Sequence, residues 1–136
     1  QQSTPHAGQH ADHLLGEIHA YFEQRIAACV AAGIPRERLI LDPGFGFGKT
    51  LDQNYELLAH LDEFADFRLP LLVGMSRKSM VGQLLDRPVE ARLAGSLALA
   101  LYAATRGAHI IRVHDVQETV DALRIFSYAD QFRTQR

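Results

Sequence analysis

Hydrophobic residues recur along this chain with two different periods, which predict four main helices separated by three short strands. From about His13 onward they return every three or four positions, as they do along one face of a helix. This first stripe consists of Leu14, Ile18, Phe22, Ile26 and Cys29. Gly33 and Pro35 then follow in the order that commonly ends a helix.

Three short hydrophobic runs, at residues 39–41, 69–74 and 109–114, are typical of buried strands. A helical segment is expected after each strand. The first begins at a Thr50-x-x-Gln53 capping box, and Asp115-x-x-Glu118 is expected to cap the last. The expected buried faces are Leu57, Leu58, Leu61 and Phe64, then Leu93, Leu97 and Leu101 within 88–105, then Val116, Val120, Leu123 and Phe126.

The order of these elements indicates an α/β fold. Helices and strands alternate, which favours a parallel sheet covered by helices. Strands buried in this way read as nearly continuous hydrophobic runs, as these do. Each strand also ends in polar residues, and active sites of such folds lie at the carboxyl ends of the strands.

Both ends of the chain are expected to be polar. Residues 1–12 predict a loop or frayed end, because Pro5 and Gly8 interrupt any helix there, and residues 130–136 predict a polar tail. The spacing of His6, His10, His13 and His19 could place imidazoles on one helical face for a metal. A solvated segment is the simpler interpretation.

Composition narrows the class of protein. Hydrophobic residues make up 47% of 136 residues, enough for one domain with a core, and the net charge of −2 argues against nucleic acid as the main partner. No hydrophobic run is long enough to span a bilayer, so we expect no membrane partner. The single cysteine, Cys29, suits a reducing cytoplasm. The first residue is Gln1, which suggests a piece of a longer chain.

The loop at residues 42–50, Asp-Pro-Gly-Phe-Gly-Phe-Gly-Lys-Thr, is the strongest candidate for a binding site. Alternate glycines let a backbone approach a ligand closely. Asp42 sits at the tip of the first strand, where it could bind a polar ligand or only cap the loop backbone. Phe45 and Phe47 are equally compatible with a core and with ligand contact. The glycine spacing fits neither a P-loop nor a dinucleotide fingerprint.

Basic residues follow the other two strands. Ser76-Arg77-Lys78-Ser79 precedes a short apolar segment at 80–85, and Ser76 could cap a helix there. Arg112 and His114 alternate onto one face of the third strand. They could pair with acids inside the domain, but two basic groups at a strand tip favour an anion such as phosphate.

A (β/α)8 barrel often builds its phosphate site from the loops after its last two strands and a short extra helix. The sequence has that order of features. Three strands cannot close a barrel of about 250 residues, so we expect the C-terminal part of a single barrel domain over residues 1–136.

These motifs resemble the dihydropteroate synthase family. The matching segments are residues 42–49, 76–79 and Arg-Val-His-Asp at 112–115, in the same order and spacing, and the similarity covers nearly the whole chain from about His13. The resemblance implies a pterin-binding barrel that joins 6-hydroxymethyl-7,8-dihydropterin diphosphate to p-aminobenzoate and releases pyrophosphate. It also implies that sulfonamides compete for the aminobenzoate site.

The resemblance implies a role for each motif residue. Asp42 would bind the pterin ring nitrogens, and Lys78 its carbonyl edge. Arg112 and His114 would bind the departing diphosphate, so Lys78, Arg112 and His114 form the catalytic set. The substrate-binding set is Asp42, Gly46, Phe47, Gly74, Lys78, Ser79, Arg112, Val113 and His114, with Phe47 and Ser79 beside the aminobenzoate.

The resemblance also implies what this chain lacks. The family's Mg²⁺ ligand lies on earlier strands, so we expect no metal ligand in this chain and no normal activity from it alone. A homodimer through the C-terminal helices is implied as well. Two alternatives stay open: a related pterin-binding methyltransferase, against which Arg112 and His114 argue, and a non-catalytic module that supplies only dimer contacts.

Overall fold

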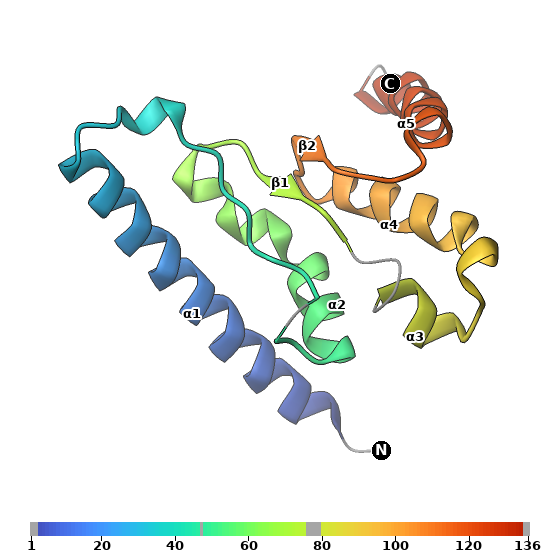
Figure 1. Cartoon of the computed structure of the whole chain (residues 1–136), viewed down its shortest axis with the longest axis horizontal. Helices are drawn as coiled ribbons and strands as arrows, with labels where there is room; N and C mark the ends of the chain where they lie inside the picture. Colours follow the sequence, from blue (N-terminus) through green and yellow to red (C-terminus); the bar gives the residue numbers. More distant parts are fainter. Residues whose placement is uncertain (1–2, 47, 76–79, 135–136) are drawn as a thin grey trace.

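The computed structural model describes residues 3–46, 48–75 and 80–134, with side chains from residue 13 onward (Figure 1). Helices dominate it, and two short strands lie near its centre. The elements are α1 (Ser3–Ala31), η1 (Arg36–Arg38), α2 (Leu51–Ala59), η2 (Leu61–Phe67), β1 (Leu72–Val73), α3 (Gly82–Leu85), η4 (Val89–Ala91), α4 (Leu93–Thr105), β2 (Ile110–Ile111), α5 (Val116–Asp130) and η5 (Gln131–Thr134).

The first helix is longer than the sequence predicts. It starts at Ser3, so the expectation of a loop over residues 1–12 is wrong. Pro5 falls in the first turn of α1, where backbone amides need no partner inside the helix. Gly8 costs about 1 kcal/mol relative to alanine, which one long helix tolerates. The expected end is confirmed, since α1 stops at Ala31 and Gly33 has a φ of +98°.

Three parallel segments form the sheet in the predicted order. β1 pairs with β2 in the register Leu72↔Ile110 and Val73↔Ile111. The first predicted strand is reduced to one bridge between Leu41 and Leu71, also parallel. Each strand is therefore shorter than its hydrophobic run, but the α/β class and the parallel arrangement hold.

Helices cover one face of this sheet with two hydrophobic clusters. The first joins α1 and η2 to the strands, and its largest members are Phe22, Phe64 and Leu71. The second joins α2, η2 and α4 to Val73, Met80 and Val81. Leu57, Leu58, Leu61 and Phe64 are all at most 2% exposed, which confirms the predicted face of that helical segment.

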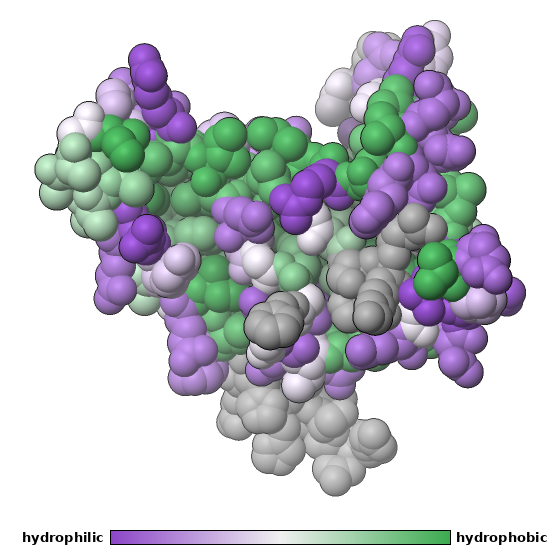
Figure 2. Space-filling view, viewed as in Figure 1, coloured by the Kyte–Doolittle hydropathy of each residue, from purple (hydrophilic) through white to green (hydrophobic). Residues whose placement is uncertain are grey.

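The opposite face of the sheet, called the open face below, carries hydrophobic side chains that no described residue covers. Ile40 is 52% exposed and Ile110 is 39% exposed. Hydrophobic residues gather across the middle of the surface in Figure 2, over the strand segments of Figure 1. A parallel sheet is normally buried on both faces, so the open face is where further protein would pack.

Helix α4 buries a different face from the predicted one. Its buried residues are Ser96, Leu99, Ala100 and Ala103, whereas Leu93 is 37% exposed and Leu97 and Leu101 are half-buried. Nearly every residue of α4 is apolar, so periodicity does not distinguish its faces. The helix also begins at Leu93 rather than at residue 88, because Val89–Ala91 form a 3-10 turn.

The last helix also departs from the prediction. Of its expected stripe, Val116 and Val120 are exposed, while Leu123 and Phe126 are half-buried. Asp115 is its N-cap residue but makes no side-chain cap bond. Residues 131–134 of the expected polar tail are exposed, and they form the 3-10 helix η5 directly after α5.

Candidate functional site

The register of the sheet brings three predicted site residues to the open face. Leu41, Leu71 and Val73 point toward the helices, so their neighbours Leu72 and Gly74 face the other way. By the same alternation Asp42 and Arg112 lie on the open face. These residues, and His114 just beyond β2, follow the carboxyl ends of parallel segments, where α/β folds place their ligands.

Gly74 and Arg112 are in direct contact. The Arg112 amide donates to the Val73 carbonyl at 2.8 Å, which places Arg112 beside Gly74 on the neighbouring strand. The guanidinium then lies over Gly74 in the space that a side chain would need. A Cβ atom on Gly74 would stand 2.7 Å from Arg112 Cζ and 2.9 Å from Nε. Because residue 74 has no side chain, the Arg112 guanidinium has room to lie directly against the strand.

The three residues Arg112, Val113 and His114 border one small cavity. Met75 and the buried Ser96 and Leu99 of α4 complete its lining. Arg112 and His114 are exposed and Val113 is half-buried. The pair of basic groups predicted from the sequence is therefore accessible to a ligand at the end of β2.

The glycine loop carries Asp42 at its start. Asp42 Oδ1 accepts a hydrogen bond from the Gly44 amide at 3.0 Å, while the side chain remains exposed. The carboxylate therefore shapes the loop and also faces solvent, so the two interpretations of Asp42 are compatible. Gly44, Gly46 and Gly48 have φ angles between +76° and +95°, which other residues rarely adopt.

Asn54 is a buried polar residue that the sequence analysis missed. Its side chain is 1% exposed, and its Oδ1 accepts from the Gly46 amide at 2.7 Å. Its Nδ2 donates to the Thr50 carbonyl at 3.1 Å. A polar residue among the buried leucines of α2 was the available signal. The capping box at Thr50 and Gln53 is confirmed beside it.

Tyr55 was also missed. Its hydroxyl donates to the Met80 carbonyl at 2.7 Å, which ties α2 to the residue that follows segment 76–79. Partial burial raises the pKa of Tyr55, so the hydroxyl stays a donor throughout the physiological range. Nothing in the periodicity distinguished Tyr55 from its neighbours.

The two phenylalanines of the loop have different outcomes. Phe45 packs against both hydrophobic clusters, so it is a core residue. Phe47 lies outside the described residues, as do Ser76, Arg77, Lys78 and Ser79. The predicted roles of these five residues remain predictions.

Among the described side chains, no three His, Cys, Asp or Glu residues gather as a group of metal ligands. The carboxylate of Asp42 on the open face is a single oxygen ligand, whereas Mg²⁺ is usually held by one or two carboxylates together with waters and substrate phosphates. Two of the four histidines considered as metal ligands lie beside acids instead: His13 Nε2 is 3.2 Å from Glu17 Oε2, and His19 Nε2 is 3.0 Å from Asp66 Oδ2. The other two, His6 and His10, are outside the described side chains.

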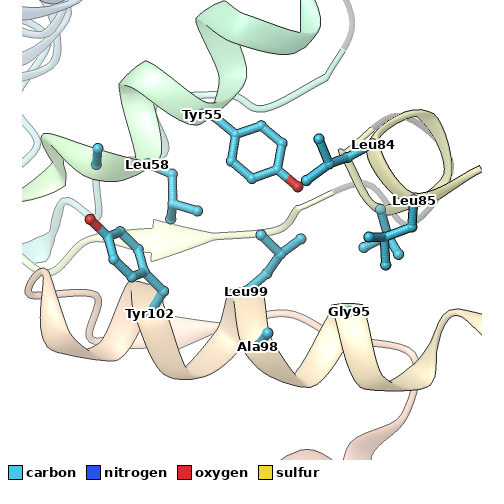
Figure 3. A pocket seen from close by; sticks show the side chains of 10 residues that line it. Tyr55, Leu58, Leu84, Leu85, Gly95, Ala98, Leu99 and Tyr102 are labelled. Atoms are coloured by element: carbon cyan, nitrogen blue, oxygen red, sulfur yellow. The ribbon is translucent and has the colours of Figure 1, made fainter.

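A separate apolar pocket of about 500 Å³ lies between α2, α3 and α4. Figure 3 shows Tyr55 and Leu58 facing Leu99 and Tyr102 across it, with Leu84 and Leu85 at one end. Apart from two tyrosine hydroxyls its lining is hydrocarbon, so it lacks groups for acid–base chemistry.

Within the described residues, no helix combines the length and the hydrophobicity that crossing a bilayer requires.

The open face can therefore recognise a ligand with two kinds of group. The exposed carboxylate of Asp42 is able to accept hydrogen bonds from a ligand, and the exposed Arg112 and His114 are suited to an anion. β1 and Gly74 lie between them, so the two binding elements flank one surface.

Comparison with known proteins gives one consistent answer. A family model described as pterin binding enzyme matches residues 1–114. The chain is 59% identical over 127 residues to the dihydropteroate synthase of Escherichia coli strain K12, covering 91% of this chain and 45% of that enzyme. It is 45% identical over 126 residues to the Haemophilus influenzae enzyme, covering 93% and 46%.

Solved structures agree. A Yersinia pestis dihydropteroate synthase with a pterine-sulfa conjugate superposes with a TM-score of 0.84 at 58% identity, over 87% of this chain and 47% of that one. A Xanthomonas albilineans dihydropteroate synthase in complex with 7,8-dihydropteroate gives 0.83 at 47% identity, over 86% and 45%. The chain thus spans about half the length of the relatives that it matches. It belongs to the family of pterin-binding enzymes, and its relatives within that family are dihydropteroate synthases.

Proposed function

We propose that this chain supplies the pterin-binding and diphosphate-binding part of a dihydropteroate synthase. The whole active site would join 6-hydroxymethyl-7,8-dihydropterin diphosphate to p-aminobenzoate. The observation that carries the proposal is the open face, where Asp42 and the Gly74–Arg112 pair stand at adjacent strand ends in a chain 59% identical to such an enzyme.

In the proposed reaction the amine nitrogen of p-aminobenzoate attacks the methylene carbon of the pterin. The bond from that carbon to the diphosphate oxygen breaks, pyrophosphate leaves with the electron pair, and the amine loses a proton. Arg112 and His114 stabilise the negative charge that grows on the leaving oxygen. An aryl amine needs no strong base to attack this carbon, so positioning supplies much of the rate.

The other predicted residues fit this scheme as proposals. Asp42 accepts hydrogen bonds from the pterin ring, and Lys78 contacts its carbonyl edge. Gly46, Phe47 and Ser79 border the aminobenzoate, and Val113 lies between the two diphosphate ligands. Sulfonamides would then compete with p-aminobenzoate. Mg²⁺ would be held mainly by a ligand outside the described part of this chain, in which no three ligating side chains gather.

Two wider properties belong to the same proposal. The three parallel segments would form part of a (β/α)8 barrel, whose remaining strands would cover Ile40 and Ile110 on the open face. The chain would assemble as a homodimer through its C-terminal helices, since α5 exposes Ile125 and Tyr128. A free cysteine, Cys29, suits action in the cytoplasm.

Pyrophosphate release tests the proposal. The purified chain is assayed with the pterin diphosphate, p-aminobenzoate and Mg²⁺, alone and with the half of the Escherichia coli enzyme that it does not match. We expect release only from the combined halves. Asp42→Ala should abolish pterin binding, and Arg112→Ala should mainly weaken diphosphate binding. Parent-like binding by both variants would refute the site.

The exposed helix α5 supports a second candidate, a non-catalytic module that supplies only dimer contacts. This function predicts self-association without any ligand binding. Calorimetric titration with the pterin diphosphate separates the two, because only the catalytic proposal predicts heat of binding that depends on Asp42.

A further inference from the structure

Two consecutive side chains at the start of α2 hold two separate loops. Asn54 accepts from the Gly46 amide in the glycine loop, and Tyr55 donates to the Met80 carbonyl. Neighbouring residues of a helix project about 100° apart, so one turn can reach in two directions. Gly46 and Met80 belong to segments that follow two different strands of the sheet.

The Asn54 contact has the features of a built anchor. The side chain is 1% exposed, so water does not compete for its oxygen. Both ends of the amide are satisfied, by the Gly46 amide at 2.7 Å and the Thr50 carbonyl at 3.1 Å. The Gly46 backbone has a φ of +95°, a conformation that this hydrogen bond helps to retain.

The Tyr55 contact joins α2 to a different part of the chain. Its ring packs against the second hydrophobic cluster, and its hydroxyl reaches Met80, whose side chain is fully buried. The helix itself is fixed by Leu57 and Leu58, which are buried, and by its capping box. Both anchors therefore start from a rigid element.

We propose that Asn54 and Tyr55 are a pair of positioning residues that set the distance between Gly46 in the glycine loop and Met80, from which the chain leads into α3. The inference rests on the proposed function, in which residues next to Gly46 and Met80 border the p-aminobenzoate. Neither residue touches substrate. The pair acts on the aminobenzoate side of the site, away from Asp42 and Arg112.

The first test needs no activity. Amide hydrogen exchange of the ¹⁵N-labelled 136-residue chain is measured by NMR, with the Leu41 amide, bonded to the Pro70 carbonyl, as reference. Asn54→Leu should speed Gly46 exchange about tenfold, the weight of one lost hydrogen bond. Asn54→Asp keeps the acceptor and should restore protection. Unchanged Gly46 exchange in Asn54→Leu would overturn the anchor, and so would fast exchange in Asn54→Asp.

The second test uses steady-state kinetics with both halves of the enzyme. Tyr55→Phe removes only the hydroxyl and should raise KM for p-aminobenzoate about three- to tenfold. KM for the pterin diphosphate and kcat should stay within about twofold. Tyr21→Phe, at a tyrosine of α1 that is 57% exposed, is the matched control and should change nothing.

Three outcomes would overturn the kinetic part of the proposal: no change in Tyr55→Phe, an equal rise of both KM values, or the same change in Tyr21→Phe. An inactive parent enzyme is a different result. It would refute the proposed function and its aminobenzoate assignment, while the exchange experiment would still decide whether Asn54 holds the loop.

Discussion

At the scale of single residues, Gly74 is important because it has no side chain. Its backbone does not need the left-handed region, so conformation alone would permit a side chain there. The guanidinium of Arg112 fills that space. The role of Gly74 in the proposed site is therefore to place a positive charge against the end of β1.

This contact predicts the behaviour of Gly74→Ala. The added methyl group would push aside Arg112, whose side chain is free to swing into solvent, so the free energy of unfolding should change by no more than about 1 kcal/mol. Pyrophosphate binding by calorimetry should weaken about tenfold, the weight of a hydrogen bond to a charged group. If the variant binds pyrophosphate as tightly as the parent, then the contact between Arg112 and Gly74 is not needed for binding.

The partly buried hydroxyl of Tyr55 predicts a dependence of stability on alkaline pH. Its pKa is raised by burial in the folded state, so its contribution to stability is complete below the unfolded pKa of about 10. That contribution is lost as the pH rises through the folded pKa. Urea unfolding above pH 10 should therefore lose stability less steeply in Tyr55→Phe than in the parent. Tyr21→Phe should follow the parent, and identical slopes for all three proteins would contradict the assignment.

At the scale of elements, close packing joins α4 to the segment before it. A Cβ atom on Gly95 would stand 2.6 Å from Val81 Cγ1, and Val81 is 1% exposed. Gly95 therefore lets α4 approach that segment closely. Gly95 also borders the apolar pocket of Figure 3, together with Leu85 and Tyr102.

Two alanine substitutions should consequently have opposite signs. Gly95→Ala forces Val81 from its buried position and should lower the free energy of unfolding by about 1–3 kcal/mol. Gly16→Ala, at a position in α1 with nothing within 4 Å, should raise it by about 0.5–1 kcal/mol. Denaturant titration measures both. A stabilised Gly95→Ala variant would mean that the α4 contact is looser than described.

At the scale of the whole molecule, hydrophobic side chains remain exposed on two surfaces. The open face shows Ile40 and Ile110, and the C-terminal helices show Ile125 at 72%, Tyr128 at 68% and Phe132 at 49% exposure. Patches of this kind commonly mark interfaces. In the proposed function, the remainder of a barrel would cover the first surface and a second copy of the chain would cover the second.

The second surface can be tested by charge. Ile125→Glu places a carboxylate in the proposed dimer interface, so sedimentation velocity should show the dimer dissociation constant rising by about tenfold or more. Tyr21→Glu changes an exposed residue of α1, at 57% exposure, and should leave association intact. If Ile125→Glu still dimerises like the parent, α5 is not the interface.

The sequence by itself determined the order of elements, the parallel sheet and the motif residues at its end. These depend on local signals: the helical stripe before Gly33, the capping box at Thr50, and polar residues directly after hydrophobic runs. Strand bounds were less certain, because a hydrophobic run of six residues can contain only two that pair. The start of α1 escaped prediction because Pro5 is harmless in a first turn.

Only the tertiary structure decided which surfaces are buried and which side chains meet. Because α4 is apolar on nearly all sides, its contacts with neighbouring elements decide which of its faces is buried. The contacts of Asn54 with Gly46, Tyr55 with Met80 and Arg112 with Gly74 each join residues far apart in the chain or on separate elements. Such contacts depend on packing in three dimensions, which periodicity along the chain does not encode.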